Sequence, residues 1–304
     1  MTEGLRLALV KGFDAWAPQV GATLSRVSGL SFHRHTAPTP PFVGFMDASL
    51  SLVVSGKKRV VLGDHIFDYG STHYLLTSVD LPVVACVTEA NEAEPYLGIL
   101  LRIDLDIVRS LLALDGDEKL GVATPLGIAS DTVTPELLDP LLRLCRLEER
   151  PAEVDLFAKQ VQREVIYRLM VSPLGHRLRS LAATESAANG VARALSWLRL
   201  NFRERKSNQS LAGIAGMGIS TFHRHFKSIT TMTPIQYRKH MQLNEARRLM
   251  IEYGMDSASA AYDVGYESPS QFSREYRRLF GKPPLASVAD LRRSLKKGTA
   301  ASAQ

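Results

Sequence analysis

The chain has 304 residues, a hydrophobic fraction of 45% and a formal net charge of +6, which favours two folded domains with buried cores and argues against a disordered chain. It contains no apolar run near the ~20 residues of a membrane-spanning helix and no basic N-terminal segment followed by an apolar one, so we expect a soluble, cytoplasmic protein without a secretory signal. Its two cysteines, Cys86 and Cys145, are too few for a disulfide framework or a structural zinc site.

The N-terminal part of the chain is predicted to be rich in strands. Residues 5–20 carry apolar side chains at helical spacing and predict a short amphipathic helix, while the prolines of residues 37–41 exclude a helix there. From about Ser49 to Ile103 the sequence shows short β-branched segments separated by Gly and Asp turns. Segments of this length and spacing predict an antiparallel sandwich or a small barrel.

Helical patterns replace the strand patterns after Asp104. Residues 107–114, 135–150 and 154–170 have apolar side chains three and four positions apart, as amphipathic helices do. The leucine-rich stretch Leu137–Leu147 and the last of these helices could form a dimer interface. They could equally close one face of the barrel.

The last third of the chain contains an internal repeat. Ala212 and Gly216 have the same spacing as Ala261 and Gly265, with an apolar residue before each glycine. The aromatic pairs that follow also share their spacing and enclose an arginine at the same place, Phe222 and Phe226 in the first copy and Phe272 and Tyr276 in the second. Each copy therefore has the pattern helix, glycine-containing turn, helix, which is that of a helix-turn-helix motif.

Simple stereochemistry accounts for the repeated positions. Alanine is small where the first helix of each unit passes the second, and glycine permits the positive φ at which the first helix ends. The two aromatic residues of each copy share one helix face and anchor the second helix in the core. The opposite face is expected to point outward, with Ser220, His223, Arg224 and Lys227 in the first copy and Ser270, Gln271, Arg274 and Arg277 in the second.

A single long helix is predicted between the two copies. It starts at Pro234 behind Thr233 as N-cap, and it ends near Gly254. A helix from Pro234 to Ile251 would be roughly 27 Å long, and successive major-groove faces on one side of B-DNA lie ~34 Å apart. One continuous helix could therefore hold two recognition helices about one DNA turn apart.

The charge is divided unevenly along the chain. Residues 191–304 contain 19 Lys and Arg against 8 Asp and Glu, whereas residues 1–190 contain 18 against 23. A basic domain attached to an acidic one favours a polyanionic partner for the basic domain alone. Together with the duplicated motif, this distribution predicts that the C-terminal domain binds double-stranded DNA.

The same residues resemble a known family. Residues 216–250, and above all AAYDVGYESPSQFSREYRRLFGKPP at 260–284, are similar to the DNA-binding domain of the AraC/XylS transcription regulators. Residues 49–64 and 81–104 resemble the N-terminal domain found in one branch of that family. The resemblance implies an α+β multidomain protein, in which a cupin-like antiparallel β-barrel with flanking helices precedes an all-α domain of two helix-turn-helix motifs joined by a long helix.

The resemblance also implies a function. It implies sequence-specific control of transcription at promoter sites, usually activation, by a homodimer that contacts RNA polymerase. It further implies gating by an unidentified signal at the N-terminal domain. The expected boundaries are a sensing and dimerisation domain over residues 1–180, a linker over 181–190, the DNA-binding domain over 191–295, and a disordered tail over 296–304.

Candidate contact residues follow from the resemblance position by position. It implies base contacts from Ser220, His223 and Arg224 in the first recognition helix, and from Ser270, Gln271 and Arg274 in the second. Arginine pairs well with guanine, and glutamine with adenine. Lys227, Ser268 and Arg277 are expected to contact phosphates, which fix register without reading sequence.

Two residues depart from the family pattern in the first motif. Gly218 stands where a serine usually caps the recognition helix, and Thr231 stands where a glycine usually ends it. A helix that starts at glycine lacks the side-chain acceptor of a serine cap, at a cost below ~1 kcal/mol. We therefore expect the first motif to be less rigid than the second.

The sensing domain offers fewer indications. His33 and His35 form a close pair without a carboxylate at metal-ligand spacing, and His65 and His73 are isolated, so no metal and no other cofactor is predicted. A small-molecule effector of unidentified chemistry is compatible with the barrel. Cys86 lies in an apolar strand pattern, which favours a buried, inert thiol over a redox sensor.

Three other classes of protein fit these features less well. An enzyme built on the barrel would need a metal triad or an acid–base pair, and we identify no catalytic residue of either kind. A DNA-repair methyltransferase would need an activated cysteine and cysteine-rich zinc ligation. An architectural DNA-binding protein without sequence preference would not need two recognition helices.

Overall fold

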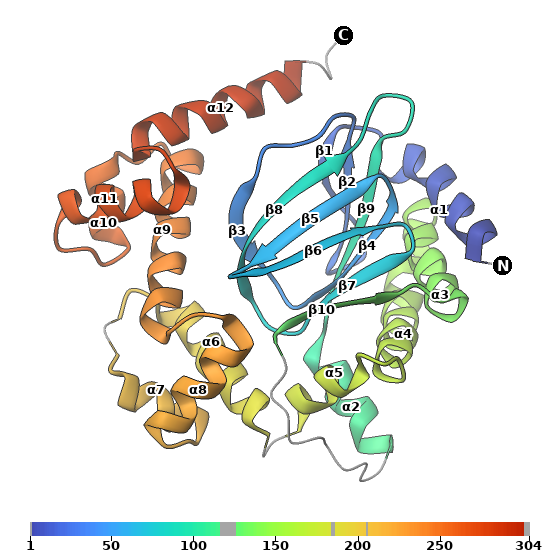
Figure 1. Ribbon diagram of the computed structural model, residues 1–304. Coiled ribbons are helices and arrows are strands. Elements are labelled where there is room, and N and C mark those ends of the chain that lie inside the picture. The colour runs from blue at the N-terminus through green and yellow to red at the C-terminus, as the bar shows by residue number, and fades with distance from the viewer. Residues whose placement is uncertain (1, 116–125, 184–185, 205, 301–304) are drawn as a thin grey trace.

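The computed structural model describes residues 2–115, 126–183, 186–204 and 206–300 (Figure 1). Two antiparallel sheets with flanking helices form the N-terminal part, and a set of helices forms the C-terminal part. This is the predicted fold class. Within the described residues, no helix is both long enough and apolar enough to span a membrane.

The strands of the described residues form a six-stranded and a four-stranded sheet, with the orders β1-β2-β9-β4-β7-β10 and β3-β8-β5-β6. Their bounds are β1 Gly21–Leu24, β2 Leu30–His35, β3 Phe42–Met46, β4 Ser49–Ser55, β5 Lys57–Leu62, β6 His65–Gly70, β7 His73–Thr77, β8 Leu81–Glu89, β9 Tyr96–Arg102 and β10 Ile128–Thr132. Sequence patterns predicted the strands between Ser49 and Ile103. They did not predict β1, β2, β3 and β10, which are short and contain few β-branched residues.

Two glycines determine how the chain enters and leaves β5. Gly63, with φ of 57°, allows the tight turn that joins β5 to β6, where Leu62 pairs with His65. Gly56 has φ of 76°, and a Cβ there would lie 2.5 Å from the carbonyl oxygen of Glu89. Gly56 therefore allows the chain to pass from β4 in the larger sheet directly into β5 in the smaller one.

Helices cover the outer face of the six-stranded sheet. They are α1 Thr2–Trp16, α2 Leu105–Asp115, α3 Pro135–Arg146, α4 Pro151–Met170 and α5 Gly175–Ala182, with a short 3-10 turn at Leu147–Glu149. Phe13 of α1, Phe32 of β2 and Leu141 of α3 belong to the buried cluster between these layers. The leucines of α3 thus cover one face of the six-stranded sheet, whereas α4 exposes Leu156 and Phe157.

The C-terminal part consists of α6 Ala187–Asn201, α7 Asn208–Ala215, α8 Ile219–Thr230, α9 Pro234–Glu252, α10 Ser257–Asp263, α11 Pro269–Phe280 and α12 Pro284–Ala300. Two sequence expectations differ from this arrangement. Residues 181–182 and 187–190 of the expected linker are helical, and Ala188 to Gly190 are buried against neighbouring elements. Residues 296–300 of the expected disordered tail continue α12, and residues 301–304 lie outside the described residues.

The two parts of the chain share a hydrophobic core. One buried cluster contains Val60 and Leu81 of the smaller sheet together with Leu195, Phe226 and Tyr237 of the helical part. The ring of Tyr237 meets those of Phe45 and Phe226 edge to face, at centroid distances of 5.5 and 5.6 Å. Because these rings are packed against one another, the sheet and the first helix-turn-helix unit are joined by more than a linker.

Polar contacts complete this interface. The Tyr237 hydroxyl donates to the carbonyl oxygen of Asp80 at 2.8 Å, and the amide of Gly127 donates to the carbonyl oxygen of Ile229 at 2.9 Å. Arg199 pairs with both Asp47 and Asp80. These bonds satisfy polar groups at the edge of the shared core, as buried groups require.

Tyr237→Phe tests whether this interface forms in solution. The ring packing stays, but the Asp80 carbonyl loses its donor, so we expect the free energy of unfolding to fall by about 1 kcal/mol. Tyr262→Phe, at a residue that is 59% exposed, serves as the control and should change it by less than about 0.5 kcal/mol. Urea unfolding followed by circular dichroism measures both, and equal effects of the two substitutions would contradict the interface.

Candidate DNA-binding surface

The second helix of each repeat, α8 or α11, is held by a buried aromatic pair. Phe222 and Phe226 lie 5.4 Å apart between ring centroids, and Phe272 and Tyr276 lie 5.5 Å apart. All four side chains are fully buried. The prediction that these residues anchor the recognition helices is confirmed, and the opposite face of each helix is left outward.

The same backbone hydrogen bond also forms at the end of the first helix in each unit. The amide of Met217 donates to the carbonyl of Ala212 at 3.0 Å, and the amide of Tyr266 donates to that of Ala261 at 2.9 Å. Gly216 and Gly265 have φ of 70° and 90°, the left-handed region that ends a helix in this way. The predicted positive φ at both glycines is confirmed, so the first helix of each unit ends in the same way, although the stretch from this glycine to the next helix is one residue longer in the second unit.

The outward faces carry the residues expected to contact DNA. Ser220, Arg224 and Lys227 of α8 are exposed, whereas His223 is half-buried with its ring beside Phe222. Ser270, Gln271, Arg274 and Arg277 of α11 are all exposed. The structure thus brings each predicted set to one accessible helix face, and the base or phosphate each residue contacts stays a prediction.

The starts of the two recognition helices differ. The Ser268 hydroxyl accepts a hydrogen bond from the amide of Gln271 at 3.3 Å, and Pro269 follows at the first helical position. Gly218 supplies no side-chain cap to α8. The Ser268 oxygen therefore caps the helix, while its O–H is still able to donate a hydrogen bond to a phosphate.

Glu275 is a residue of this surface that sequence reasoning did not identify. Its carboxylate accepts hydrogen bonds from Lys239 Nζ at 2.6 Å, Tyr266 Oη at 2.8 Å and Gln271 Nε2 at 3.2 Å. Burial alone would raise the pKa of this carboxyl, but the three hydrogen bonds outweigh burial and hold the pKa below its ordinary value. Glu275 thereby orients Gln271, a predicted base contact, and ties α11 to α9.

Helix α9 begins with a full capping box. The Thr233 hydroxyl accepts from the amide of Gln236 at 3.3 Å, and the Gln236 side chain accepts from the amide of Thr233 at 2.9 Å. The helix then runs over 19 residues to Glu252. The predicted N-cap and the predicted single helix between the repeats are both confirmed.

The candidate residues of the sensing domain lie apart from this surface. His33 and His35 line a cavity that Cys86 also borders, whereas His65 is exposed on β6 and His73 contacts Thr72. Cys86 is half-buried, so the expectation of a buried thiol was wrong for it, and Cys145 is the buried one. The described residues contain no group of three or more His, Cys, Asp or Glu side chains that could hold a metal ion.

The two recognition helices end in the same backbone conformation but with different residues, Thr231 and Gly281. Both α8 and α11 end in the left-handed region, at Thr231 with φ of 63° and at Gly281 with φ of 76°. In each case the end residue's amide donates to the carbonyl four residues earlier at 2.8 Å. A β-branched residue is strained there, and the buried Thr231 hydroxyl has no hydrogen-bond partner among the described residues.

We expect Thr231→Gly to raise the free energy of unfolding by about 1 kcal/mol, because glycine adopts this conformation without strain. The reciprocal substitution Gly281→Thr should lower it by about 1–2 kcal/mol, since nothing else lies within 4 Å of a Cβ at that position. Urea unfolding of the two variants checks both values. Destabilisation by Thr231→Gly would show that packing of the threonine outweighs its backbone strain.

Comparisons with other proteins agree with this architecture. Residues 26–177 match a family model for the N-terminus of AraC-type transcriptional regulators, and residues 211–289 match a helix-turn-helix domain model. The HTH-type transcriptional activator RhaS of Pectobacterium carotovorum is 32% identical over 99 residues, which cover 33% of this chain and 36% of RhaS. RhaS of Escherichia fergusonii is 30% identical over 145 residues, 46% of this chain and 50% of RhaS.

These matches cover half or less of the curated relatives' length. The fold extends further, because ToxT from Vibrio cholerae, solved with an unsaturated fatty acid bound, superposes with a TM-score of 0.58 at 12% identity. That superposition covers 88% of this chain and 96% of ToxT. The chain belongs to the AraC-type transcriptional regulators, with an N-terminal regulatory domain and a C-terminal helix-turn-helix DNA-binding domain.

Proposed function

We propose that this chain binds specific promoter sequences by placing α8 and α11 in neighbouring segments of the major groove. The residues proposed to contact base edges are Ser220, His223, Arg224, Ser270, Gln271 and Arg274. Lys227, Ser268 and Arg277 would contact phosphates. The protein would act in the cytoplasm, as a homodimer, and as an activator that contacts RNA polymerase, as the RhaS relatives are activators by name.

One observation carries this proposal. Two helices, matched in their anchoring rings, turn hydrogen bonds and left-handed end conformation, both leave arginine-bearing faces exposed. Binding by phosphate contacts alone would need only positive charge, not two faces of the same geometry. The duplication therefore favours reading of sequence over architectural DNA binding, and we propose a regulator rather than an enzyme.

Arg247 of α9 is proposed to transmit a signal from the N-terminal domain. Its guanidinium carbon lies 4.7 Å from the ring centre of Phe42 in β3 and 4.2 Å from that of Phe280 at the end of α11. The guanidinium also donates to the carbonyl oxygen of Val43 and to Asn244 Oδ1. A shift of β3 would therefore move Arg247, and with it the end of the second recognition helix.

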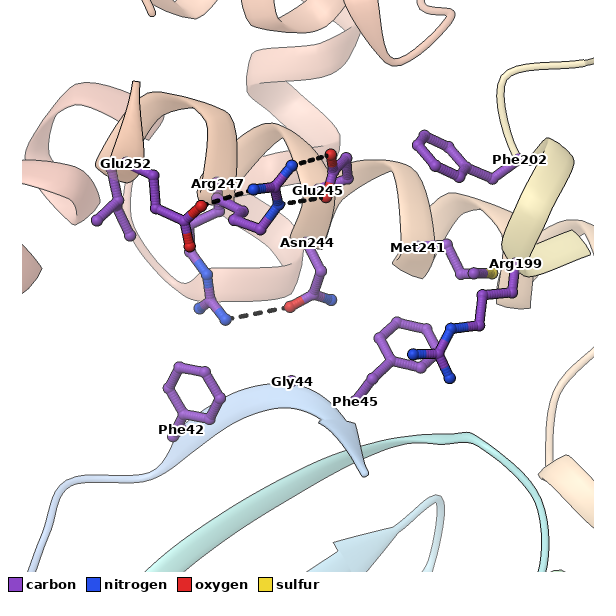
Figure 2. Close-up of a pocket in the computed structure, with 12 residues that line it drawn as sticks. Phe42, Gly44, Phe45, Arg199, Phe202, Met241, Asn244, Glu245, Arg247 and Glu252 are labelled. Atoms are coloured by element: carbon purple, nitrogen blue, oxygen red, sulfur yellow. Dashed lines mark hydrogen bonds and ion pairs between the residues drawn. The ribbon is translucent and has the colours of Figure 1, made fainter. Parts of the chain in front are cut away.

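A groove of about 550 Å³ lies beside this contact (Figure 2). Phe42 and Phe45 border it on the β3 side, and Met241 and Asn244 border it on the α9 side. Because ToxT has been solved with a bound fatty acid, a small molecule is the kind of signal that we propose here. Binding of this molecule would change either the orientation of the DNA-binding domain or the formation of the dimer.

The homodimer is proposed to form through α4. This helix exposes Leu156 and Phe157 at 64% and 46%, whereas the leucines of α3 are used inside the chain. Sedimentation at micromolar concentration, with and without promoter DNA, tests this part of the proposal. A monomer under both conditions would rule it out.

Arg274→Ala and Arg277→Ala test the division between base and phosphate contacts. We expect Arg274→Ala to lose about 1–3 kcal/mol of binding free energy and to relax preference at one base pair, since it removes a base contact. Arg277→Ala should weaken all sequences equally and reduce the slope of log affinity against log salt by about 1. Binding titrations with a base-substitution series of one site measure both effects.

The two substituted residues lie three positions apart on the same helix, so each variant is the control for the other. An equal loss of affinity for every sequence in Arg274→Ala would identify Arg274 as a phosphate contact. In that case the assignment of base contacts on α11 would be wrong.

A further inference from the structure

A second cavity, of about 360 Å³, lies between the two sheets of the N-terminal domain. Its apolar part is formed by Phe42, Val87 and Tyr96, and its polar part by His33, His35 and Lys58. These residues come from β2, β3, β5, β8 and β9, so strands of both sheets build it. Small-molecule sites range from about 300 to 1,000 Å³, and this cavity is at the small end of that range.

The alternation of β5 explains how a lysine reaches this cavity. Lys57 and Arg59 are exposed and pair with Glu89 and Asp68, each at 2.7 Å. Lys58 lies between them on the opposite face, which it shares with the buried Val60. No described carboxylate lies within ion-pair distance of Lys58, in contrast to its two neighbours.

The ammonium of Lys58 therefore has no carboxylate partner among the described residues, and the neighbouring Cys86 thiol opposes the effect of burial only in part. Burial lowers the pKa of Lys58 to about 8, which still leaves most of the amine protonated near neutral pH. Burial, together with the charge of Lys58, lowers the pKa of His33 to about 4 and lowers that of His35. The lowered pKa values favour the neutral, hydrogen-bonding form of both imidazoles, and an ammonium without an anionic partner beside them is costly until an anion arrives.

We propose that this cavity binds a small monocarboxylate with an apolar body. Its carboxylate would accept hydrogen bonds from Lys58 and a neighbouring imidazole, and its apolar part would pack against Phe42, Val87 and Tyr96. A dianion such as phosphate fits less well, because a single cation would leave one negative charge uncompensated. The inference rests on the proposed role of the N-terminal domain as the receiver of a signal.

Phe42 connects the cavity to the DNA-binding domain. The same side chain borders this cavity and the groove beside α9, and its ring lies under Arg247. A ligand that packs against Phe42 in the cavity would therefore change the contact between β3 and α9. Phe42 would thus transmit the effect of ligand binding through Arg247 to the end of α11.

Titration calorimetry of the full chain tests the site without DNA. The probes are cyclohexanecarboxylate, phenylacetate and octanoate, each paired with its neutral amide. We expect at least one acid, and none of the amides, to bind the wild-type chain, with an affinity that Lys58→Met lowers about 10–100-fold. Lys57→Met, which removes the neighbouring lysine from the outer face, should bind like the wild type. Acids that bind no better to the wild type than to Lys58→Met would overturn the proposal.

Stability without ligand gives a second, independent readout. Because Lys58 is an uncompensated charge, Lys58→Met should raise the melting temperature of the ligand-free chain by about 2–4 °C. If Lys58 instead stabilised the fold, its substitution by methionine would lower the melting temperature. A lower melting temperature for Lys58→Met would therefore overturn the proposal even if acid binding were lost.

The effect on DNA separates this site from the proposed signalling route. In the wild type, a bound acid should change the affinity for promoter DNA, and in Arg247→Met the acid should bind equally well without that change. If the acid binds but leaves DNA affinity unaltered in the wild type, the site stands and the proposed coupling through Arg247 fails.

Discussion

Helix α9 determines where both recognition helices can lie. It packs against α8, α10, α11 and α12, and its capping box fixes where it begins. After Pro234 it contains neither proline nor glycine over its 19 residues, so it lacks the residues at which helices most often kink. The spacing between the two helix-turn-helix units is therefore set by a rigid element, and binding of DNA by both units requires that this spacing match the groove.

The same helix connects the DNA-binding domain to the sheets. Tyr237 and Arg247 lie ten positions apart, roughly 15 Å along the axis, and both contact the N-terminal domain. One contact is a buried ring in the shared core, and the other is a guanidinium between two aromatic rings. Because the helix is rigid, a change at β3 can alter the orientation of the whole domain rather than one side chain.

Much of the C-terminal domain could be predicted from its sequence, because its local rules agree with its packing. The glycine turns, the N-caps at Thr233 and Ser268 and the buried aromatic pairs each follow from residue chemistry at fixed spacing. The roles of Glu275 and Arg247 could not be predicted this way, since their partners lie on other helices or on β3. Strand β2 was missed because it has no β-branched residue and carries polar side chains on both faces, with His33 and His35 lining a cavity and Arg34 pairing with Asp14 of α1.

The most direct test of the account is selection of random double-stranded DNA by the full-length chain at physiological salt, followed by sequencing. We expect enriched sequences with two short blocks whose centres lie about 10 base pairs apart, one block for each recognition helix. Recovery of a single block, or of no preferred sequence, would contradict the claim that both helices read DNA together.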